Sequence, residues 1–527
     1  MTPSMPHILW ADDEIDLLKA HVLFLEAKGY DVTSVTNGAD AVAHVKDTRY
    51  DVVFLDEQMP GLGGLDALAE IKAVRPDTPV VMITKSEEEH LMEDAIGGQI
   101  SDYLIKPVNP KQILLTCKRL LQGSEIRAQK SSQNYLQAFG RLSGQIGAGL
   151  SPEEWIEVYQ ELTHYDLELE GAEEGVRQIL DDQYREANSA FAKYIEAAYP
   201  GWIEAVAAGK KPQETGRPAL SHEIFPTWVL PELENDKPLL FFLIDCMRYD
   251  QWLAFEQLLL PLFDVETNWH YGLLPTATPY SRNAIFSGLL PMDIAARFPQ
   301  FWTSVERDED ASLNQHESEF LQDLLKRRHL DSRLRYEKIV STNNGQAFAE
   351  SVTDFTQVDL AAIVVNFVDI LAHSRSDSAV LKEIAPDVAA YRSLTQTWFV
   401  HSWLYQAFQT LAEQDVTIVI TTDHGAVRSL HATKVIGDRD TSTSLRYKHG
   451  RNLKVDADDA IFVKDPETYG LPRESINENY IFAKEDYYFV YPTNYNRYLN
   501  QYRDTFQHGG VSMEEMLLPV ITLRSRK

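Results

Sequence analysis

Cysteine is scarce in this chain, whose 527 residues contain only Cys117 and Cys246. Two thiols cannot build the disulfide framework of a small secreted scaffold, and the N-terminus shows neither the basic start nor the apolar run of a signal peptide. We therefore expect a cytoplasmic protein. Long apolar runs are missing as well. Those present are strand-sized and interrupted, so we expect no segment that spans a bilayer.

Positive charge is the other deficit. The chain has 49 Lys and Arg against 79 Asp and Glu, a formal net charge of -30. This excess of negative charge opposes nonspecific attraction to nucleic acid or anionic membrane, so neither direct sequence-specific DNA binding nor membrane association is expected. What the chain does have is length and apolar content. With 44% hydrophobic residues it can fill the cores of the two or three domains that its length predicts.

Short apolar runs alternate with amphipathic segments over residues 1–122. We expect strands near residues 7–12, 31–36, 51–56, 79–84 and 102–106, with helices between them. This rhythm predicts a doubly wound parallel sheet with helices on both faces and active groups at the carboxyl ends of the strands. Those ends carry Asp12, Asp13, Asp56, Thr84 and Lys106. Carboxylate oxygens suit Mg²⁺, which shields a carboxylate that receives a phosphoryl group. The sequence thus predicts an aspartyl phosphorylation site.

These residues resemble the CheY-like receiver domain of response regulators. The resemblance implies that Asp56 is the phosphoacceptor, that Asp12, Asp13 and Asp56 hold Mg²⁺, that Thr84 and Lys106 contact the phosphoryl group, and that Tyr103 is the aromatic switch. It also implies a cognate histidine kinase as partner and a homodimer on phosphorylation, formed through the face of residues 87–121. Lys85 departs from the family, which usually has a small residue there, and bears on the access or lifetime of the phosphoryl group.

Residues 123–220 have the composition and spacing of a helical connector. Apolar residues recur at helical intervals through Trp155, Leu162 and Val176, and three or four helices are expected, punctuated by Pro152 and by Pro200-Gly201. The region shows no basic recognition helix, and its Asp and Glu outnumber its Lys and Arg. We therefore expect a coupling segment and not a DNA reader. The stretch 210–218 is the predicted boundary to the next domain.

Four apolar runs organise residues 221–527. Residues 238–244 precede Asp245, residues 360–368 precede Asp369, residues 416–422 precede Asp423-His424, and His508 comes shortly before residues 516–523. His373 follows Asp369 by four residues. Runs of this kind are typical of a central, mostly parallel sheet buried on both faces, with polar residues gathered at strand ends. Carboxylate and imidazole groups are ligands of zinc, and six of them divide into two sites of three, each with a position left open for chemistry.

A threonine-rich loop, residues 273–288, lies between the first and second of these runs and leads into a predicted helix. A threonine hydroxyl at such a helix start could attack a phosphoryl centre once a metal removes its proton. Thr278 is our first candidate for the nucleophile, and Thr276 is the alternative.

Together these residues resemble the alkaline phosphatase superfamily, in particular its PglZ branch, over residues 221–527. The resemblance implies that Asp369, His373 and His508 hold one zinc ion and that Asp245, Asp423 and His424 hold the other, with Thr278 as nucleophile at the metals. Thr278, Ser281 and Arg282 fall on the spacing of the sulfatase Cys-x-Pro-Ser-Arg motif, although the proline is displaced to position 279.

Several neighbouring residues leave two interpretations open. Arg248 could clamp a phosphoryl group or pair with Asp250, and Asn283 could donate to a phosphoryl oxygen or to its own backbone. The basic segment 446–451 could line a substrate entrance or form a solvated turn. Residues 304–340, dense in charge and helical in pattern, are expected to form an insertion or lid.

A receiver joined through helices to a PglZ domain resembles the PorX-type response regulators, which are associated with type IX secretion. The resemblance implies a zinc-dependent phosphodiesterase that acts on nucleotide or oligonucleotide substrates under the control of Asp56, with phosphate monoesters and sulfates as the alternative substrates. The alternative is a regulator whose zinc centre is catalytically minor and which signals by contact with a protein such as an alternative sigma factor.

Overall fold

The computed structural model describes residues 5–85, 100–235, 237–302, 314–438, 442, 444–473, 475, 477–493 and 495–526. The chain forms two compact units, Met1–Gln133 and Asn134–Lys527. Each unit is an α/β structure built around one principal sheet, as the apolar runs predict. Among the described residues, no helix combines the length and the apolar character that a membrane crossing requires.

The first unit contains a five-stranded parallel sheet in the order β2-β1-β3-β4-β5. Alternate residues of β1 point to opposite faces, so Leu9 packs in one core and Trp10 in the other. Helices cover both faces, which confirms the doubly wound receiver fold. The strands are β1 His7–Ala11, β2 Asp31–Val35, β3 Val52–Asp56, β4 Val80–Thr84 and β5 Asp102–Ile105; the helices are η1 Ile15–Leu18, α1 Lys19–Glu26, α2 Gly38–Asp47 and α3 Gly64–Val74.

Helix α5 runs without interruption from Pro110 to Gly147, so it contains both the last helix of the receiver and the first of the connector. Helix α6 (Pro152–Glu168) begins at Pro152, where the sequence predicts a break, and its N-cap Ser151 forms a capping box with Glu154. The prediction that Pro200-Gly201 interrupts the connector is wrong, because α7 (Glu174–Ala207) continues through Pro200. Packing of α7 against the second unit's core outweighs the lost backbone hydrogen bond. A short helix, α8 (Pro212–Thr215), follows.

The second unit is organised around a six-stranded mixed sheet in the order β7-β18-β10-β6-β9-β8. Strands β10, β6, β9 and β8 pair in parallel, whereas β18 is antiparallel to both of its neighbours, β10 and β7. This confirms the expected mostly parallel sheet. The strands are β6 Leu239–Ile244, β7 Phe263–Tyr271, β8 Leu334–Ile339, β9 Leu360–Val365, β10 Thr417–Thr421 and β18 Leu517–Ser525.

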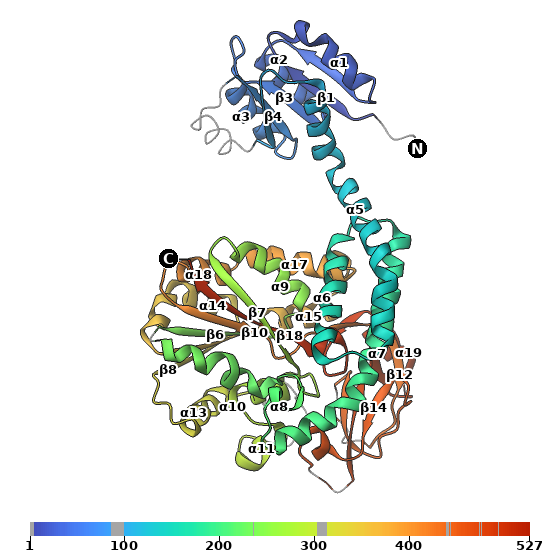
Figure 1. Cartoon of the computed structure of the whole chain (residues 1–527), viewed down its shortest axis with the longest axis vertical. Helices are drawn as coiled ribbons and strands as arrows, with labels where there is room; N and C mark the ends of the chain where they lie inside the picture. The colour runs from blue at the N-terminus through green and yellow to red at the C-terminus, as the bar shows by residue number, and fades with distance from the viewer. Residues whose placement is uncertain are drawn as a thin grey trace. The chain divides into compact units, whose positions relative to one another are not determined.

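Helices pack on both faces of this sheet, and adjacent residues of β6 show why its sequence is apolar throughout. Phe241 contacts Phe286 of α10, whereas Phe242 contacts Phe408 of α18. Figure 1 accordingly shows α10 and α13 on one side of the sheet and α17 and α18 on the other. The helices are α9 Tyr249–Leu259, α10 Thr278–Ser287, α11 Pro291–Arg297, α13 Glu317–Arg327, α14 Thr342–Glu350, α15 Phe367–Asp377, α16 Ala379–Ile384, α17 Val388–Val400 and α18 Trp403–Leu411.

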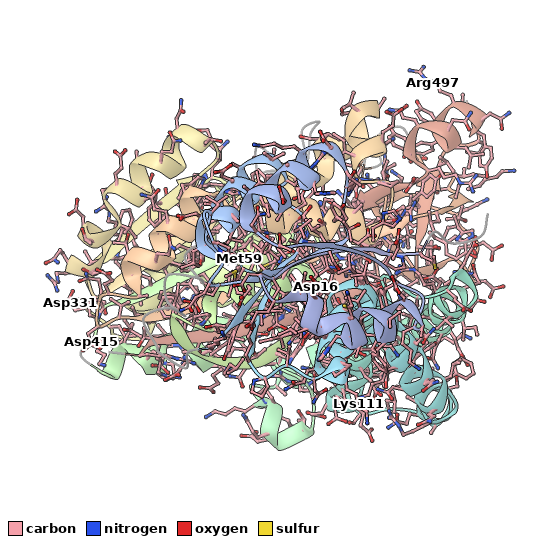
Figure 2. The ribbon with its side chains drawn as sticks, turned by 90° about the horizontal axis from the view of Figure 1, so that it is seen from above. Asp16, Met59, Lys111, Asp331, Asp415 and Arg497 are labelled. Atoms are coloured by element: carbon pink, nitrogen blue, oxygen red, sulfur yellow. The ribbon has the colours of Figure 1, made fainter. Side chains whose placement is uncertain are left out.

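The remaining elements are short. Three small sheets pair β11 with β17, β12 with β16, and β15 with both β13 and β14. The elements are η2 Ser221–Glu223, η3 Phe225–Val229, η4 Leu230–Asn235, η5 Val352–Gln357, β11 Val427–Ser429, β12 His431–Lys434, β13 Tyr447–Arg451, β14 Ala460–Val463, η6 Pro466–Tyr469, β15 Glu478–Ala483, β16 Tyr487–Val490, α19 Tyr495–Tyr502, β17 Thr505–Gln507 and α20 Met513–Met516. Charged side chains such as Asp331, Asp415 and Arg497 lie at the periphery of this unit (Figure 2).

The predicted lid over residues 304–340 is wrong where the structure describes it. Residues 334–339 form strand β8 at the edge of the central sheet, and α13 packs through buried Phe320, Leu321 and Leu324. The charged residues between these apolar positions form the solvent face of elements that belong to the core. Residues 304–313 lie outside the described part of the chain.

Candidate functional site

Three buried ligand-type side chains meet where β6 and β10 end. Asp245 follows β6, and Asp423 and His424 follow β10; because the two strands are parallel neighbours, their carboxyl ends adjoin. Ligand atoms of all three residues lie within 4.8 Å of one another. His424 Nε2 is 3.7 Å from Asp245 Oδ1 and 3.9 Å from Asp423 Oδ1. We call this group the inner cluster.

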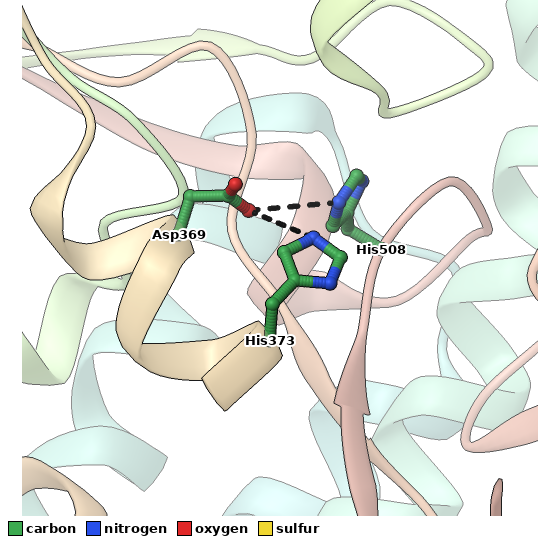
Figure 3. Close-up of side chains that lie close together, drawn as sticks. All are labelled: Asp369, His373 and His508. Atoms are coloured by element: carbon green, nitrogen blue, oxygen red, sulfur yellow. Dashed lines mark ion pairs between the residues drawn. The ribbon is translucent and has the colours of Figure 1, made fainter. Parts of the chain in front are cut away.

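A second group, the outer cluster, joins Asp369 and His373 of α15 to His508 of the loop after β17 (Figure 3). Asp369 Oδ1 lies 3.4 Å from His373 Nε2 and 3.8 Å from His508 Nε2. The sequence placed Asp369 at a strand end, but β9 ends at Val365 and Asp369 lies in the first turn of α15. Because Phe367 and Val368 continue the apolar run, sequence alone could not separate strand from helix. The four-residue spacing then puts Asp369 and His373 on one helix face.

The two clusters adjoin through their histidines. The rings of His424 and His508 stack with centroids 4.0 Å apart. Each ring has its Nδ1 near a backbone carbonyl: His424 Nδ1 is 3.1 Å from Gly425 O, and His508 Nδ1 is 3.3 Å from Thr276 O. An Nδ1–H donated to a carbonyl leaves the Nε2 lone pair directed at the carboxylates. Burial and the neighbouring His424 lower the pKa of His508 to about 3, which keeps its imidazole neutral.

Arg282 is the cation buried within the inner cluster. Its Nε lies 2.9 Å from Asp423 Oδ2, and its guanidinium also pairs with Asp245. Burial raises the pKa of Asp245 well above its usual range although Arg282 opposes the shift, and nearby Asp423 raises it further. Burial acts on Asp423 in the same sense, but Arg282 and His424 outweigh it and lower that pKa. The sequence singled out Arg282 only through motif spacing, because its carboxylate partners lie far away in the chain.

The donor chemistry of both clusters fits a metal such as zinc. Asp245 Oδ1 and Asp369 Oδ1 are buried and have no hydrogen-bond partner among the described residues, yet each faces imidazole Nε2 atoms within 4 Å. Buried carboxylate oxygens without a partner are costly, and a divalent cation would satisfy both. Three oxygen and nitrogen ligands per ion match the number that catalytic zinc sites provide. These six residues could therefore hold two ions.

Thr278 stands at the inner cluster as the first residue of α10. Its Oγ1 is 3.0 Å from His424 Nε2, and the side chain is buried. Thr276 has another role: its hydroxyl donates to Gly510 O at 2.8 Å and accepts from Gly509 N at 3.1 Å. Since both capacities of the Thr276 hydroxyl are used in holding the loop of His508, the geometry favours Thr278 as nucleophile.

The two residues with open interpretations make contacts within the protein. Arg248 Nε donates to Asp250 Oδ1 at 2.8 Å, and Arg248 Nη1 donates to Ala426 O at 3.3 Å. Asn283 Nδ2 donates to Pro279 O at 2.9 Å, although the side chain is buried and not at the surface. The geometry therefore favours pairing of Arg248 with Asp250 and a backbone hydrogen bond for Asn283 over contacts with a phosphoryl group.

Backbone geometry around the clusters is tight. Cys246, directly after Asp245, has φ +64°, a conformation that is uncommon for a residue other than glycine. A Cβ on Gly425 would lie 1.9 Å from Glu514 O, so the segment after His424 needs glycine. Most of the basic segment 446–451 forms strand β13, which begins at Tyr447, and Arg446 just before it is fully buried. Arg446 Nε donates to Glu515 Oε1, which also accepts from Gly510 N at 2.9 Å. The sequence alone did not indicate that Arg446 and Glu515 hold the loop of His508.

The receiver has its own carboxylate cluster, in which Asp12, Asp13 and Asp56 bring oxygens within 4.8 Å of one another. Lys106 Nζ lies 2.9 Å from Asp12 Oδ2 and 3.0 Å from Asp56 Oδ2. Burial raises the pKa of Asp56, an effect that the hydrogen bond from Lys106 opposes. These three carboxylates could hold Mg²⁺, which takes oxygen ligands.

Two other predicted switch residues are placed as follows. The Thr84 hydroxyl donates to the Glu57 side chain, and Tyr103 is 42% exposed. Lys85 is exposed, and residues 86–99 lie outside the described part of the chain, so the predicted dimer face of residues 87–121 is described only from residue 100.

Comparison with protein families finds three matches. Residues 224–523 match the BREX system PglZ alkaline phosphatase-like domain, residues 8–118 match the response regulator receiver domain, and residues 125–203 match the PorX response regulator linker domain. The order of these domains matches a PorX-type response regulator.

Individual relatives resemble the receiver end of the chain. The transcriptional regulatory protein ResD of Bacillus subtilis (strain 168) is 31% identical over 26% of this chain and 58% of its own length, and the response regulator SaeR of Staphylococcus aureus (strain USA300) is 32% identical over 22% and 51%. The chain thus spans about half the length of these curated relatives.

Solved structures match the same region. The receiver domain protein of Methanospirillum hungatei JF-1 has 24% identity over 23% of this chain and 96% of its own, with a TM-score of 0.22. Vibrio cholerae CheY4 has 27% identity over 22% of this chain and 99% of its own, also with a TM-score of 0.22.

Proposed function

Because the chain belongs to the family of the BREX system PglZ alkaline phosphatase-like domain, and is a response regulator by its receiver, we propose that it is a phosphorylation-controlled, zinc-dependent phosphodiesterase. Its substrates are nucleotide or oligonucleotide diesters. The observation that carries the proposal is the approach of Thr278 Oγ1 to His424 Nε2 beside two adjoining clusters of zinc-type ligands.

In this proposal Asp369, His373 and His508 hold one zinc ion, and Asp245, Asp423 and His424 hold the other. Zinc in such sites lowers the pKa of a coordinated hydroxyl or water and polarises the phosphoryl group. Arg282 stabilises the ionised carboxylates of the inner cluster. The backbone carbonyls of Gly425 and Thr276 fix the ring orientations of His424 and His508.

The chemical role falls on Thr278. Its hydroxyl loses the proton, its Oγ1 forms a bond to phosphorus, and the bond from phosphorus to the leaving alcohol breaks, with the proton passing to that alcohol. Water then attacks the phosphorus, the bond to Thr278 Oγ1 breaks, one proton of the water passes to Oγ1, and a phosphate monoester is released.

The charges near the site favour a diester, which is a monoanion, over a dianionic monoester. Arg282 is paired with Asp245 and Asp423, and Arg248 is paired with Asp250. Neither guanidinium is left to neutralise a second substrate charge.

The upstream and downstream partners follow from the same architecture. A receiver implies phosphorylation by a histidine kinase, and we place the phosphoryl group on Asp56 with Mg²⁺ held by Asp12, Asp13 and Asp56. We further propose a cytoplasmic protein that dimerises on phosphorylation, contacts an alternative sigma factor and acts in the regulation of type IX secretion.

Hydrolysis of bis(4-nitrophenyl) phosphate by the zinc-loaded protein tests the enzymatic proposal. Thr278→Ala should lower kcat by about 10³-fold or more, because the group that forms the covalent bond is removed. Thr276→Ser keeps its hydroxyl and is the matched control, expected to retain most of the activity. Equal turnover by Thr278→Ala and wild type would contradict the nucleophile assignment. Zinc binding without any turnover would leave signalling by protein contact as the function.

A further inference from the structure

A cavity of about 940 Å³ lies in the second unit apart from both clusters. Its wall includes the segment around α8, η2, the end of β7 and the residues that follow α10. None of the six proposed zinc ligands, and neither Thr276 nor Thr278, lines it. Its volume is within the range of small-molecule sites.

Cationic side chains stand around this cavity without carboxylate partners. Lys210, Lys211 and Arg328 line it, are exposed, and make no ion pair with any described residue. In a chain of net charge -30, three cations without ion-pair partners line this one cavity, which also has Glu153 and Asp293 in its wall, and they form a local attraction for an anion.

A buried ion pair fixes the loop that carries two of these lysines. Arg217, 4% exposed, pairs with both carboxylate oxygens of Glu223 at 2.7 Å, and Arg217 Nη2 donates to Lys210 O at 3.0 Å. Glu223 Oε2 also accepts from Leu220 N at 3.0 Å. A bidentate arginine–carboxylate pair holds a fixed geometry, so the lysines extend from an ordered support.

Two buried polar groups in the wall have atoms that no described residue satisfies. His222 is 7% exposed and its Nδ1 has no hydrogen-bond partner, and the same is true of Arg217 Nε. Buried polar atoms are rarely left unpaired in folded proteins. Both residues line the cavity, although the two unpaired atoms are themselves shielded from solvent within its wall.

Two tryptophan side chains and two carboxylates also line the cavity. Trp228 and Trp269 are half-buried and line the cavity, and the Trp269 ring is supported by Tyr249 with centroids 4.7 Å apart. Indole faces of this kind stack on nucleobases. Glu153 and Asp293 provide acceptors for ribose hydroxyls or a base amino group. Inorganic phosphate would contact only the cationic side chains and would leave the tryptophans and carboxylates of the wall without a ligand.

We propose that this cavity binds a nucleotide monophosphate, with its phosphate at Lys210, Lys211 and Arg328 and its base against the tryptophans. The ligand is of the product class of the hydrolysis proposed above, and only that link rests on the proposed function. Leu289 and Leu290 of the wall follow directly on α10, the helix that begins at Thr278. The cavity is thus a second nucleotide site joined by one helix to the proposed nucleophile.

Titration calorimetry of the zinc-loaded full chain with adenosine monophosphate tests the proposal. The double variant Lys210→Glu, Lys211→Glu should bind at least about tenfold more weakly than wild type, because two charge-assisted contacts are lost. The matched variant Lys454→Glu, Lys464→Glu reverses two exposed lysines outside the cavity and should bind as wild type does. Neither adenosine nor inorganic phosphate alone should match the monophosphate, and binding should persist in EDTA.

Four results overturn the proposal: no binding at about 1 mM nucleotide, equal weakening in both double variants, equal affinity for inorganic phosphate, or loss of binding in EDTA. Absence of diester hydrolysis in the wild type would contradict the proposed function and leave these titrations unchanged, so the two failures are distinguishable.

Discussion

Thr276 illustrates how single side chains prepare the proposed site. Its hydroxyl ties Gly509 and Gly510 to the threonine loop, and its carbonyl lies 3.3 Å from His508 Nδ1. The residue therefore positions a proposed zinc ligand without being one. The sequence left Thr276 open as an alternative nucleophile, because hydroxyl partners more than 230 residues away cannot be read from local spacing.

We expect Thr276→Val to weaken zinc binding by about 10- to 100-fold, the usual effect of removing a group that orients a metal ligand. Competition between the protein and a chromogenic chelator measures this affinity. Thr276→Ser, which retains the hydroxyl, should keep wild-type affinity. If valine and serine variants bind zinc equally well, the hydroxyl does not position His508.

The positions of the six proposed ligands were predictable because most of them follow a buried apolar run, and parallel strands bring such ends together. Their roles as zinc ligands remain predictions. What the sequence could not provide were the partners of buried charges. Arg282 pairs with residues 37 and 141 positions away, and Arg446 reaches Glu515 across 69 positions. No local pattern specifies such pairs.

At the scale of elements, the connector helices are part of the core that supports the site. Tyr199 of α7 accepts a hydrogen bond from Leu274 N, in the loop that leads to Thr278, at 3.0 Å. Asn188 of α7 accepts from Met513 N and donates to Glu514. Movement of α7 would therefore act on the threonine loop and on the segment after His508 directly.

Helix α6 is tied to the same core through Arg392 of α17. This guanidinium contacts Asp166 of α6 at 2.9 Å, Glu170 in the turn after α6 at 2.6 Å, and Asp250 of α9 at 2.9 Å. Arg392 is 3% exposed, so its loss would take one of two guanidinium partners from the buried Asp250 carboxylate and would also remove the close partner of Asp166.

Arg392→Met should lower the free energy of unfolding of the second unit by about 3 kcal/mol. Urea titration followed by tryptophan fluorescence measures it, since every tryptophan except Trp10 lies in that unit. Arg185→Met, which removes an exposed pair with Asp182, is the control and should cost less than about 1 kcal/mol. Equal losses in the two variants would show that the network does not stabilise the fold.

Sequence predicted element type better than element limits. The receiver strands and the strands of the central sheet lie close to their predicted ranges, because alternation and apolar runs are strong signals. The misassigned segments are those in which tertiary packing, and not the local sequence, determines the secondary structure. Residues 334–339 are charged but form an edge strand beside β9, and α7 runs through Pro200 because its apolar face is buried.

At the scale of the whole molecule, α5 connects the receiver to the connector as one helix from Pro110 to Gly147. We expect phosphorylation of Asp56 to convert the protein to a dimer, as receivers generally do, and so to act on the second unit through the connector. Sedimentation velocity with Mg²⁺ and a small-molecule phosphoryl donor should show a shift to the dimer. With the same phosphoryl donor, Asp56→Asn should sediment as the unphosphorylated wild type does. An unchanged wild type would contradict dimerisation.

We propose above all that six Asp and His side chains form a centre for two zinc ions beside Thr278. Elemental analysis of the purified, zinc-saturated chain tests it most directly. We predict two zinc ions per wild-type chain and one in each of Asp245→Ala and His508→Ala, because each variant removes a ligand of one cluster only. Zinc content near zero in the wild type, or unchanged in both variants, would contradict the account.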